Sequence, residues 1–198
     1  MQTCNRKIQR KAGFPDNVHW ANFIRNLDEL DLERLSPGER EEVFHAFAPD
    51  TKMQVYGRGI RRRLAPMLSG NLSRMKMVYN LIFALPGVPV IMYGDEIGMG
   101  DNLFYKGRTG VRTPMQWNSS ENGGFSQVSS EKIKIKPVNE GVFSYHFINV
   151  EEQENNPDSL LNEIKKIHKD KKRTIKDQYS NIFPCNRLEQ RGSSWTFV

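Results

Sequence analysis

The feature that most constrains this chain is the short apolar run at residues 88–93, which lies between the turn residues Pro86-Gly87 and Gly94. A continuous apolar run of this length is typical of a parallel strand that is buried on both faces. The run Trp20–Arg25, rich in aromatic and apolar residues, is predicted to be a second strand. Parallel strands require a crossover connection, and segments with helical spacing lie between these two runs.

Two longer helices and one short helix are predicted between the strands. The first opens at Ser36-Pro37-Gly38-Glu39, where proline and acids suit a first turn, and stops at Pro49-Asp50. The second is capped by Ser73 and ends at Pro86-Gly87. Ile60–Met67 is predicted to be the short helix. The expected buried faces carry Val43, Phe44 and Phe47 in the first helix, and Met77, Leu81, Phe83 and Ala84 in the second.

After the second strand, residues 98–139 show little periodicity and are dominated by glycine, asparagine, serine and threonine. A loop of this length inside a compact domain is unusual and is often functional. Pro157-Asp158-Ser159 then opens a last helix. Its predicted buried side carries Leu160, Leu161, Ile164 and Ile167.

The resulting order is strand, helices, strand, long loop and helix, which is an α/β pattern with one crossover. Two strands cannot form a stable parallel sheet alone, because each needs neighbours to cover its edges and faces. The chain has 198 residues, whereas a complete (β/α)8 barrel usually needs about 250. The pattern therefore predicts an incomplete sheet.

The composition of the chain bears on where in the cell the protein is found. No apolar run approaches the roughly 20 residues that span a bilayer, and no apolar core follows the basic start at residues 1–11. Cys4 and Cys185 lie far apart and outside any CxxC pair, so we expect reduced thiols and no metal site. These features favour a cytoplasmic protein without membrane contact.

The net charge of +6 is concentrated in two clusters, Arg61-Arg62-Arg63 and Lys165–Lys176. Basic patches bind phosphate backbones, but no nucleic-acid reader motif accompanies these clusters. We expect no nucleic-acid partner. The clusters are expected to be solvated faces, or arginines that pair with acids elsewhere in a larger protein.

The segment Asn26-Leu27-Asp28-Glu29 comes at the carboxyl end of the first predicted strand. In α/β barrels this end carries the catalytic groups. A carboxylate such as that of Asp28 could stabilise a developing cationic sugar ring. Equally, Asp28 could do no more than cap the next segment, and spacing alone favours that structural role.

Several ordered motifs resemble those of the α-amylase family (glycoside hydrolase family 13), in its trehalose synthase and oligo-1,6-glucosidase branch. Residues 23–30 are similar to its F-L-R-N-H-D-E-L segment, residues 87–100 to G-x-P-x-x-x-Y-G-D-E-I-G-M-G, and residues 112–117 to R-T-P-M-Q-W. The weaker matches lie at 59–66, 124–126, 149–151 and 157–162. The resemblance covers about residues 14–169, and several motifs at matching spacing make it specific.

The resemblance implies roles for particular residues. Asp28 occupies the place of the third family carboxylate, which stabilises the oxocarbenium-like transition state. Asn26 and Arg112 correspond to substrate-binding positions, and a guanidinium offers donors that suit sugar hydroxyls. For Arg112 the alternative is a salt bridge to an acid in the long loop. Asp95 and Glu96 are expected to hold the turn after the second strand.

The chain also departs from the family pattern. Leu27 stands where the family has a histidine beside the third carboxylate, and leucine cannot donate to a sugar hydroxyl. Gly107 stands where relatives commonly have an acid. The family nucleophile aspartate and the acid/base glutamate have no counterpart, and Glu29 cannot replace them, because retaining chemistry needs carboxyls on both sides of the scissile bond.

The resemblance implies an α/β fold that is the C-terminal portion of a (β/α)8 TIM barrel. This portion is incomplete and would contain approximately strands seven and eight, their helices and a long loop. We expect a basic N-terminal segment at 1–13, the barrel part at 14–176, and a remnant at 177–198 that leads toward a C-terminal β domain. No cofactor is expected.

Three functions remain open from the sequence. The first is a fragment of an enzyme that acts on α-glucosidic bonds, such as those of maltose and trehalose. We expect this fragment to be inactive alone, and a missing N-terminal barrel half is its possible partner. The second is a non-catalytic carbohydrate-binding or protein-interaction module derived from the same fold. The third is a basic nucleic-acid binder, which would show steeply salt-dependent affinity.

Overall fold

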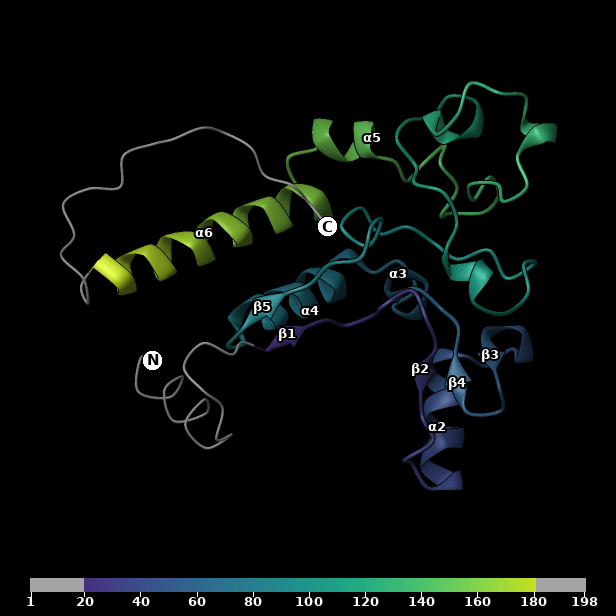
Figure 1. Cartoon of the computed structure of the whole chain (residues 1–198), viewed down its shortest axis with the longest axis horizontal. Coiled ribbons are helices and arrows are strands. Elements are labelled where there is room, and N and C mark those ends of the chain that lie inside the picture. The colour runs from purple at the N-terminus through teal and green to yellow at the C-terminus, as the bar shows by residue number, and fades with distance from the viewer. Residues whose placement is uncertain (1–19, 181–198) are drawn as a thin grey trace.

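The computed structural model describes residues 20–180 of the chain, with side chains as far as Lys171. The basic segment 1–13, Cys4, Cys185 and most of the predicted C-terminal remnant lie outside the described residues. Within the described part, a long α-helix crosses one end, and loops with short helical turns occupy the other (Figure 1).

The two predicted strands pair in parallel, as the sequence indicates. They are β1 (Ala21–Asn22) and β5 (Val88–Pro89), with Ala21 opposite Val88. The Val88 amide donates to the Trp20 carbonyl at 2.7 Å, and the Val90 amide donates to the Asn22 carbonyl at 2.8 Å. The regular pairing is shorter than predicted because each strand has a neighbour on one edge only among the described residues.

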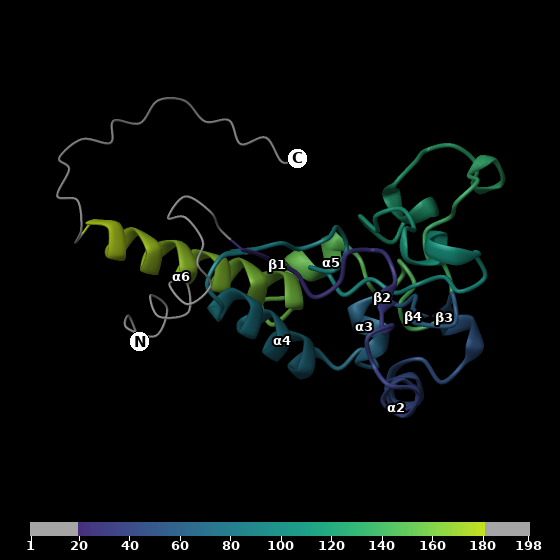
Figure 2. The same cartoon turned by 60° about the horizontal axis from the view of Figure 1, so that its bottom comes forward.

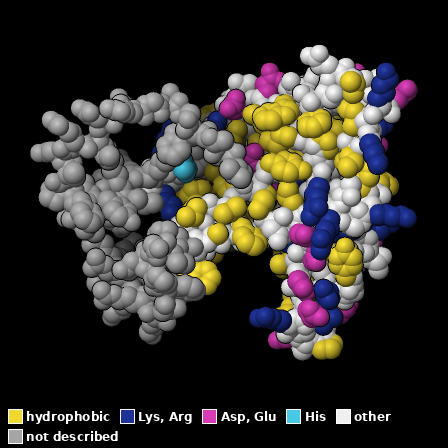
Figure 3. All heavy atoms as spheres, viewed as in Figure 1, with side chains coloured by type: hydrophobic (Ala, Val, Ile, Leu, Met, Phe, Trp, Pro, Cys, Tyr) yellow, Lys and Arg dark blue, Asp and Glu magenta, His cyan; other side chains and the backbone are white. Residues whose placement is uncertain are grey.

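Full burial of these strands was a wrong expectation. Val88 is 54% exposed and Trp20 is 52% exposed, and Phe23 and Tyr93 are also about half exposed. A parallel strand becomes buried when helices or other strands cover both of its faces, and in the described part of the chain one face lacks such cover. Hydrophobic side chains are visible across the centre of this view of the molecule (Figure 3).

The main core lies between α4 (Leu72–Ala84) and α6 (Leu160–Ser180), which lie side by side next to the parallel pair (Figures 1 and 2). Leu160 and Ile164 are buried on α6, as the spacing of its apolar residues predicts. The helix continues past residue 176, so the predicted boundary at 176/177 falls inside it. The buried members of this core are Leu64, Ala65, Met75, Tyr79, Phe83, Leu160 and Ile164.

Helix α4 differs from its prediction in two respects. Its N-cap is Asn71, whose side chain accepts from the Arg74 amide at 3.0 Å, whereas Ser73 was expected to cap it. Its buried face is Met75, Tyr79 and Phe83, whereas Met77 and Leu81 are 65% and 60% exposed. Two apolar stripes run along this helix, and contact with α6 selects the one that is buried.

A second core is built around a small antiparallel sheet with the order β2 (Leu30–Asp31), β4 (Gly59–Ile60) and β3 (Gln54–Val55). Helix α2 (Pro37–Phe47) packs on it and begins with the predicted Ser36–Glu39 capping box. η1 (Thr51–Met53) leads into β3. The core contains Leu32, Phe44, Ala48 and Ile60.

The predicted helix Ile60–Met67 is only partly helical. Ile60 belongs to β4, and the helix is the single turn α3 (Leu64–Met67). Pairing of β4 with strands on both sides fixes extended backbone at Ile60, and this tertiary context outweighs local helix propensity. The three arginines that follow Ile60 join the sheet to α3.

The arginine cluster was also predicted wrongly, because it is neither a solvated face nor dependent on acids elsewhere. Arg62 pairs with Asp101 at 3.2 Å, and Arg63 pairs with Asp95 at 2.9 Å. Arg61 donates to the carbonyl groups of Leu103, Tyr105 and Gly107. All three guanidinium groups therefore hold the long loop against the core.

The predicted long loop contains no α-helix or β-strand between residues 98 and 139. Three short 3-10 turns interrupt it: η2 (Gly107–Val111), η3 (Glu121–Gly124) and η4 (Ser130–Lys132). Helix α5 (Val150–Asn155) follows. A third core of Ile97, Met99 and Met115 lies under the loop, which explains how a segment without regular structure keeps one conformation.

Candidate functional site

The turn that follows β1 holds Asp28 in a defined position. Leu27, which precedes it, has a φ of 56° and a buried side chain. The Asp28 amide donates to Oδ1 of Asn26 at 3.1 Å, and Oδ1 of Asp28 accepts from the Glu29 amide at 2.9 Å. A left-handed leucine is uncommon and costs backbone free energy. The turn therefore bends sharply at Leu27 and presents Asn26 and Asp28 together.

The side chain of Arg25 anchors this turn through hydrogen bonds. In the sequence analysis, Arg25 is assigned no role. Its side chain is buried. Its Nη2 donates to the carbonyl of Asp28 at 2.7 Å and of Ile60 at 3.1 Å, and its Nε donates to the Arg62 carbonyl at 2.9 Å. A buried arginine needs such partners. Its position at the end of the predicted apolar run 20–25 is the signal that could have pointed to a structural role.

Arg112 reaches the same turn from the far end of η2. Its Nη2 lies 3.3 Å from Oδ2 of Asp28, and its Nε donates to the Leu27 carbonyl at 2.9 Å. The two residues are 84 positions apart in the chain. The salt bridge that was considered as an alternative for Arg112 is thus present, but its acid is Asp28 and not an acid of the long loop.

Arg108 is the second cation on this carboxylate, and the sequence did not single it out. Its Nε contacts Oδ1 of Asp28 and lies 3.0 Å from Oε2 of Glu29, and its Nη2 lies 3.2 Å from Oε1 of Glu29. The guanidinium also lies 5.8 Å from the centre of the Tyr56 ring. Hydrogen bonds with Asp28 and with Arg108 lower the pKa of Glu29 to about 2. Glu29 is therefore ionised at neutral pH.

The loop that carries these arginines is fixed by the segment that follows β5. The Tyr93 hydroxyl donates to the Thr113 carbonyl at 3.0 Å. Arg63 donates through Nη1 to Asp95 and to the Tyr93 carbonyl, and through Nε to the Val111 carbonyl. Asp95 thus helps to hold the turn after the strand, as expected. Thr113 and Val111 flank Arg112, so these bonds set where its side chain starts.

The four residues predicted from the sequence, Asn26, Leu27, Asp28 and Arg112, lie in one cluster, and Arg108 and Glu29 complete it. Both carboxylate oxygens of Asp28 face a guanidinium. Such a carboxylate can oppose positive charge on a sugar ring, and the partly exposed arginines can donate to hydroxyl groups. The aromatic residues Tyr93 and Trp117 are about half exposed.

A profile of the family described as "Alpha amylase, catalytic domain" matches residues 61–178. The chain belongs to the α-amylase family. The match covers the arginine cluster, the end of β5 and Arg112, whereas Asp28 lies before it. The resemblance inferred from the motifs is therefore confirmed at the level of the family.

Trehalose synthases are among the most similar relatives of this α-amylase-family chain. It is 43% identical over 176 residues to the trehalose synthase of Thermus thermophilus, across 89% of this chain and 18% of that protein. It is 43% identical over 148 residues to the trehalose synthase/amylase TreS of Mycolicibacterium smegmatis, across 75% of this chain and 25% of that protein. The chain thus spans about a fifth to a quarter of the length of these relatives.

One relative with a different description matches a shorter part. An amino acid transporter heavy chain of Mus musculus is 40% identical over 91 residues, across 42% of this chain and 12% of that protein. Among solved structures, isomaltulose synthase of Erwinia rhapontici NX5 superposes with a TM-score of 0.50 at 21% identity, across 87% of this chain and 30% of that one. That likeness supports a part of the α-amylase-family barrel fold.

No helix within residues 20–180 has the length and the apolar character of a membrane-spanning segment. The same residues contain no group of three or more His, Cys, Asp or Glu side chains that could hold a metal ion.

Proposed function

We propose that this chain is the C-terminal part of the catalytic barrel of a trehalose-synthase-like enzyme that acts on α-glucosidic bonds. β1 and β5 would be about strands seven and eight of that barrel, with α4 and α6 as their helices. Parallel pairing of the two strands and the identity to trehalose synthases support this assignment. The proposed barrel part is 14–176, between a basic segment at 1–13 and a remnant at 177–198.

The observation that carries the proposal is the contact between Arg112 and Asp28 at 3.3 Å. It joins the turn that follows β1 to the long loop that follows β5, and α/β barrels place their active sites in the segments that follow the carboxyl ends of their strands. We assign Asp28 as the transition-state-stabilising carboxylate, because its charge would oppose the positive charge of an oxocarbenium-like ring. Asn26 and Arg112 are assigned to hold sugar hydroxyls.

Alone, the chain is proposed to be inactive. Retaining cleavage needs a nucleophile and a general acid whose carboxyls are about 5–5.5 Å apart across the scissile bond. Among the described residues, Glu29 is the acid that accompanies Asp28, and it is paired with Arg108 on the same side. Leu27 also removes a donor from the first sugar subsite. A partner with the N-terminal barrel half would have to supply the missing groups.

The test is glucose release from maltose or p-nitrophenyl-α-glucoside, first by the pure chain and then after co-expression with the N-terminal part of a trehalose synthase relative. We expect no release by the pure chain and measurable release by the pair. The Asp28→Asn variant should abolish the activity of the pair. Release by the pure chain would contradict the proposal, and so would a pair whose activity is unchanged by Asp28→Asn.

A second candidate function is a non-catalytic carbohydrate-binding or protein-interaction module. The identity to an amino acid transporter heavy chain favours it, because that relative is named as a chain of a transporter. Such a module must fold without a partner. A thermal melt followed by near-UV circular dichroism distinguishes the two functions: a sharp cooperative transition of the pure chain supports the module, and a flat trace supports the barrel fragment.

A further inference from the structure

The outer edge of β1 carries backbone groups without partners. The Val90 amide donates to the Asn22 carbonyl at 2.8 Å, so Asn22 turns its backbone groups toward β5. Because neighbouring residues of a strand direct these groups to opposite edges, those of Ala21 and Phe23 point away from β5. Neither residue has a backbone hydrogen-bond partner among the described residues. Two amides and two carbonyls therefore line an open edge of the sheet.

This edge carries none of the usual protection against pairing with another strand. Residues 20–24 read Trp-Ala-Asn-Phe-Ile, without a charge or a proline. Edge strands of soluble proteins are commonly protected by charged side chains, proline or a bulge. Phe23 is 49% exposed, and aromatic residues favour extended, paired backbone. The edge of β1 is therefore open to a further strand.

The opposite edge of the parallel pair, on β5, is protected. The Val88 and Val90 amides donate to β1, so the position between them, Pro89, faces the free edge. Proline has no N–H to donate and is confined to such edges in sheets. A head-to-tail contact, in which β1 of one copy pairs with β5 of the next, would lack this hydrogen bond. A second β1 edge is the better match for the first.

Two β1 edges are complementary to one another about a two-fold axis. In antiparallel pairing centred on Asn22, Ala21 of one copy lies opposite Phe23 of the other, and each such pair exchanges two hydrogen bonds. The four bonds use all the unpaired backbone groups of both residues in both copies. Since the segment has no charge, the symmetry brings no like charges together. A contact of this isologous type closes with two copies.

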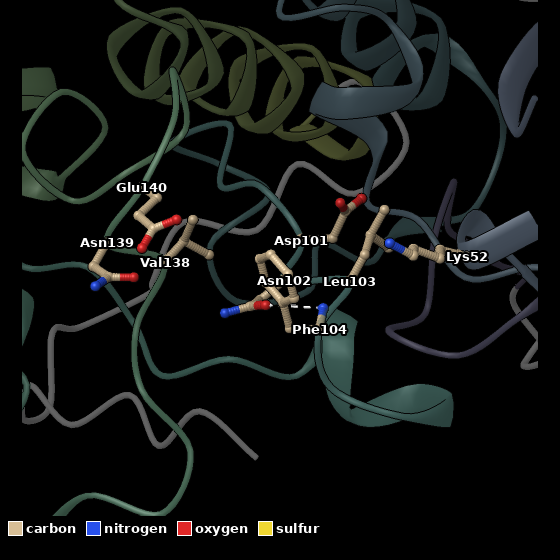
Figure 4. Close-up of a pocket in the computed structure, with 8 residues that line it drawn as sticks. All are labelled: Lys52, Asp101, Asn102, Leu103, Phe104, Val138, Asn139 and Glu140. Carbon is tan, nitrogen blue, oxygen red and sulfur yellow. Dashed lines mark hydrogen bonds between the residues drawn. The ribbon is translucent and has the colours of Figure 1, made fainter. Parts of the chain in front are cut away.

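The hollow beside the long loop, of about 350 Å³, does not offer a comparable contact. Figure 4 shows the side chains of Lys52, Asp101 and Glu140 among those that line it. A contact between two copies there would remove these charged groups from water, and the desolvation of charge opposes association. The uncharged edge of β1 carries no such cost.

We propose that the chain forms a homodimer in which the two β1 strands pair antiparallel through Ala21 and Phe23. The result is a four-stranded sheet with the order β5, β1, β1 and β5. The partner is thus a second copy of this chain, held by main-chain hydrogen bonds and by the exposed ring of Phe23. The dimer does not depend on the proposed enzyme function.

Sedimentation velocity of the full chain over a wide range of protein concentration measures the monomer–dimer equilibrium. Phe23→Pro should weaken dimerisation more than about tenfold, because each copy loses a donor and leaves an Ala21 carbonyl of the other unpaired. The amides that hold β5 to β1 are those of Val88 and Val90, so this variant keeps them. Phe23→Leu is the matched control with an N–H and an apolar side chain, and its effect should be less than about threefold.

Ala21→Lys is a second variant, which keeps every N–H and places two like charges near one another across the two-fold axis. It should weaken the dimer, and added salt should restore part of the loss. A dimer that is unchanged in both Phe23→Pro and Ala21→Lys overturns the proposal, as does a chain that is monomeric throughout or grows into open-ended oligomers. A chain that is monomeric alone and associates only with the N-terminal part of a trehalose synthase relative also overturns it, and assigns this edge to that partner.

Discussion

Nη1 of Arg63 lies 2.9 Å from Oδ1 of Asp95, and both side chains are almost completely buried. The same guanidinium donates to the carbonyls of Tyr93 and Val111. This ion pair therefore joins the segment before α3, the turn that follows β5 and the turn that leads to Arg112. These contacts offset the desolvation cost of burying the two charges. Loss of the Asp95 carboxylate would leave the Arg63 guanidinium buried without a counter-ion.

We predict that Asp95→Asn destabilises the fold by about 3–5 kcal/mol, because the Arg63 charge stays buried without its counter-ion. Urea unfolding at pH 7 measures this change. Glu154→Gln makes the same chemical change in the exposed pair with Lys165, and it should cost less than about 1 kcal/mol. Equal effects of the two variants would show that the buried pair is not what holds these segments together.

Glu96 provides a prediction for how the stability of the fold depends on pH. Burial raises its pKa, the nearby Asp95 charge adds to the rise, and its Oε2 has no partner among the described residues. A carboxyl with a raised pKa stabilises the fold below its unfolded pKa of about 4.3. That stability is lost as the pH rises through the folded pKa. Glu96 therefore favours the folded state in acid and opposes it at neutral pH.

Glu96→Gln should accordingly stabilise the protein at pH 7 by about 1 kcal/mol, because an amide carries no charge to bury. The advantage should shrink toward pH 4, where the native carboxyl is protonated. Denaturant midpoints of both proteins from pH 4 to pH 7 give the comparison. An advantage that is the same at every pH would mean that the ionisation of Glu96 is not the cause.

The two faces of α4 give a packing prediction. Phe83→Ala should destabilise the chain by about 3–5 kcal/mol, since Phe83 is buried against α6. Leu81→Ala should change stability by about 0.5 kcal/mol or less, since Leu81 is 60% exposed. Chemical denaturation compares the two. A large loss in Leu81→Ala would indicate that a partner, such as a second copy, covers this face in solution.

Leu27 gives a prediction for sugar affinity. Leu27→His should tighten binding of maltose about tenfold in the complex with an N-terminal barrel half, because imidazole can donate to a hydroxyl group. The φ of 56° at this position suits histidine better than leucine. Isothermal titration measures the affinity, and Leu27→Met is the volume-matched control without a donor. The same gain in both variants would argue against a hydrogen bond as its source.

Much of the local structure was predictable because it depends on near neighbours in the chain. The capping box runs over the four residues from Ser36 to Glu39, so a single short segment is enough to place the start of α2. The apolar spacing from Leu160 to Ile164 placed the buried side of α6. The parallel pairing of the two apolar runs was likewise predictable, since an intervening helix permits the crossover.

The candidate site was predictable in part. Resemblance to family motifs pointed to Asn26, Asp28 and Arg112, and their contacts bring them together. Arg108 and Arg25 were missed because their role depends on partners far away in the chain. An arginine followed by small polar residues, as at Arg108, resembles any exposed loop residue until Glu29 is folded against it.

The sequence by itself determined the family, the helix starts with complete local caps, and the presence of a long loop after the second strand. Only the tertiary structure decided which stripe of α4 is buried, that Ile60 is extended, and that Arg61, Arg62 and Arg63 turn inward. The physical reason is the range of the interactions. Caps and turns are satisfied within a few residues, whereas burial and ion pairing depend on which distant segments cover each side chain.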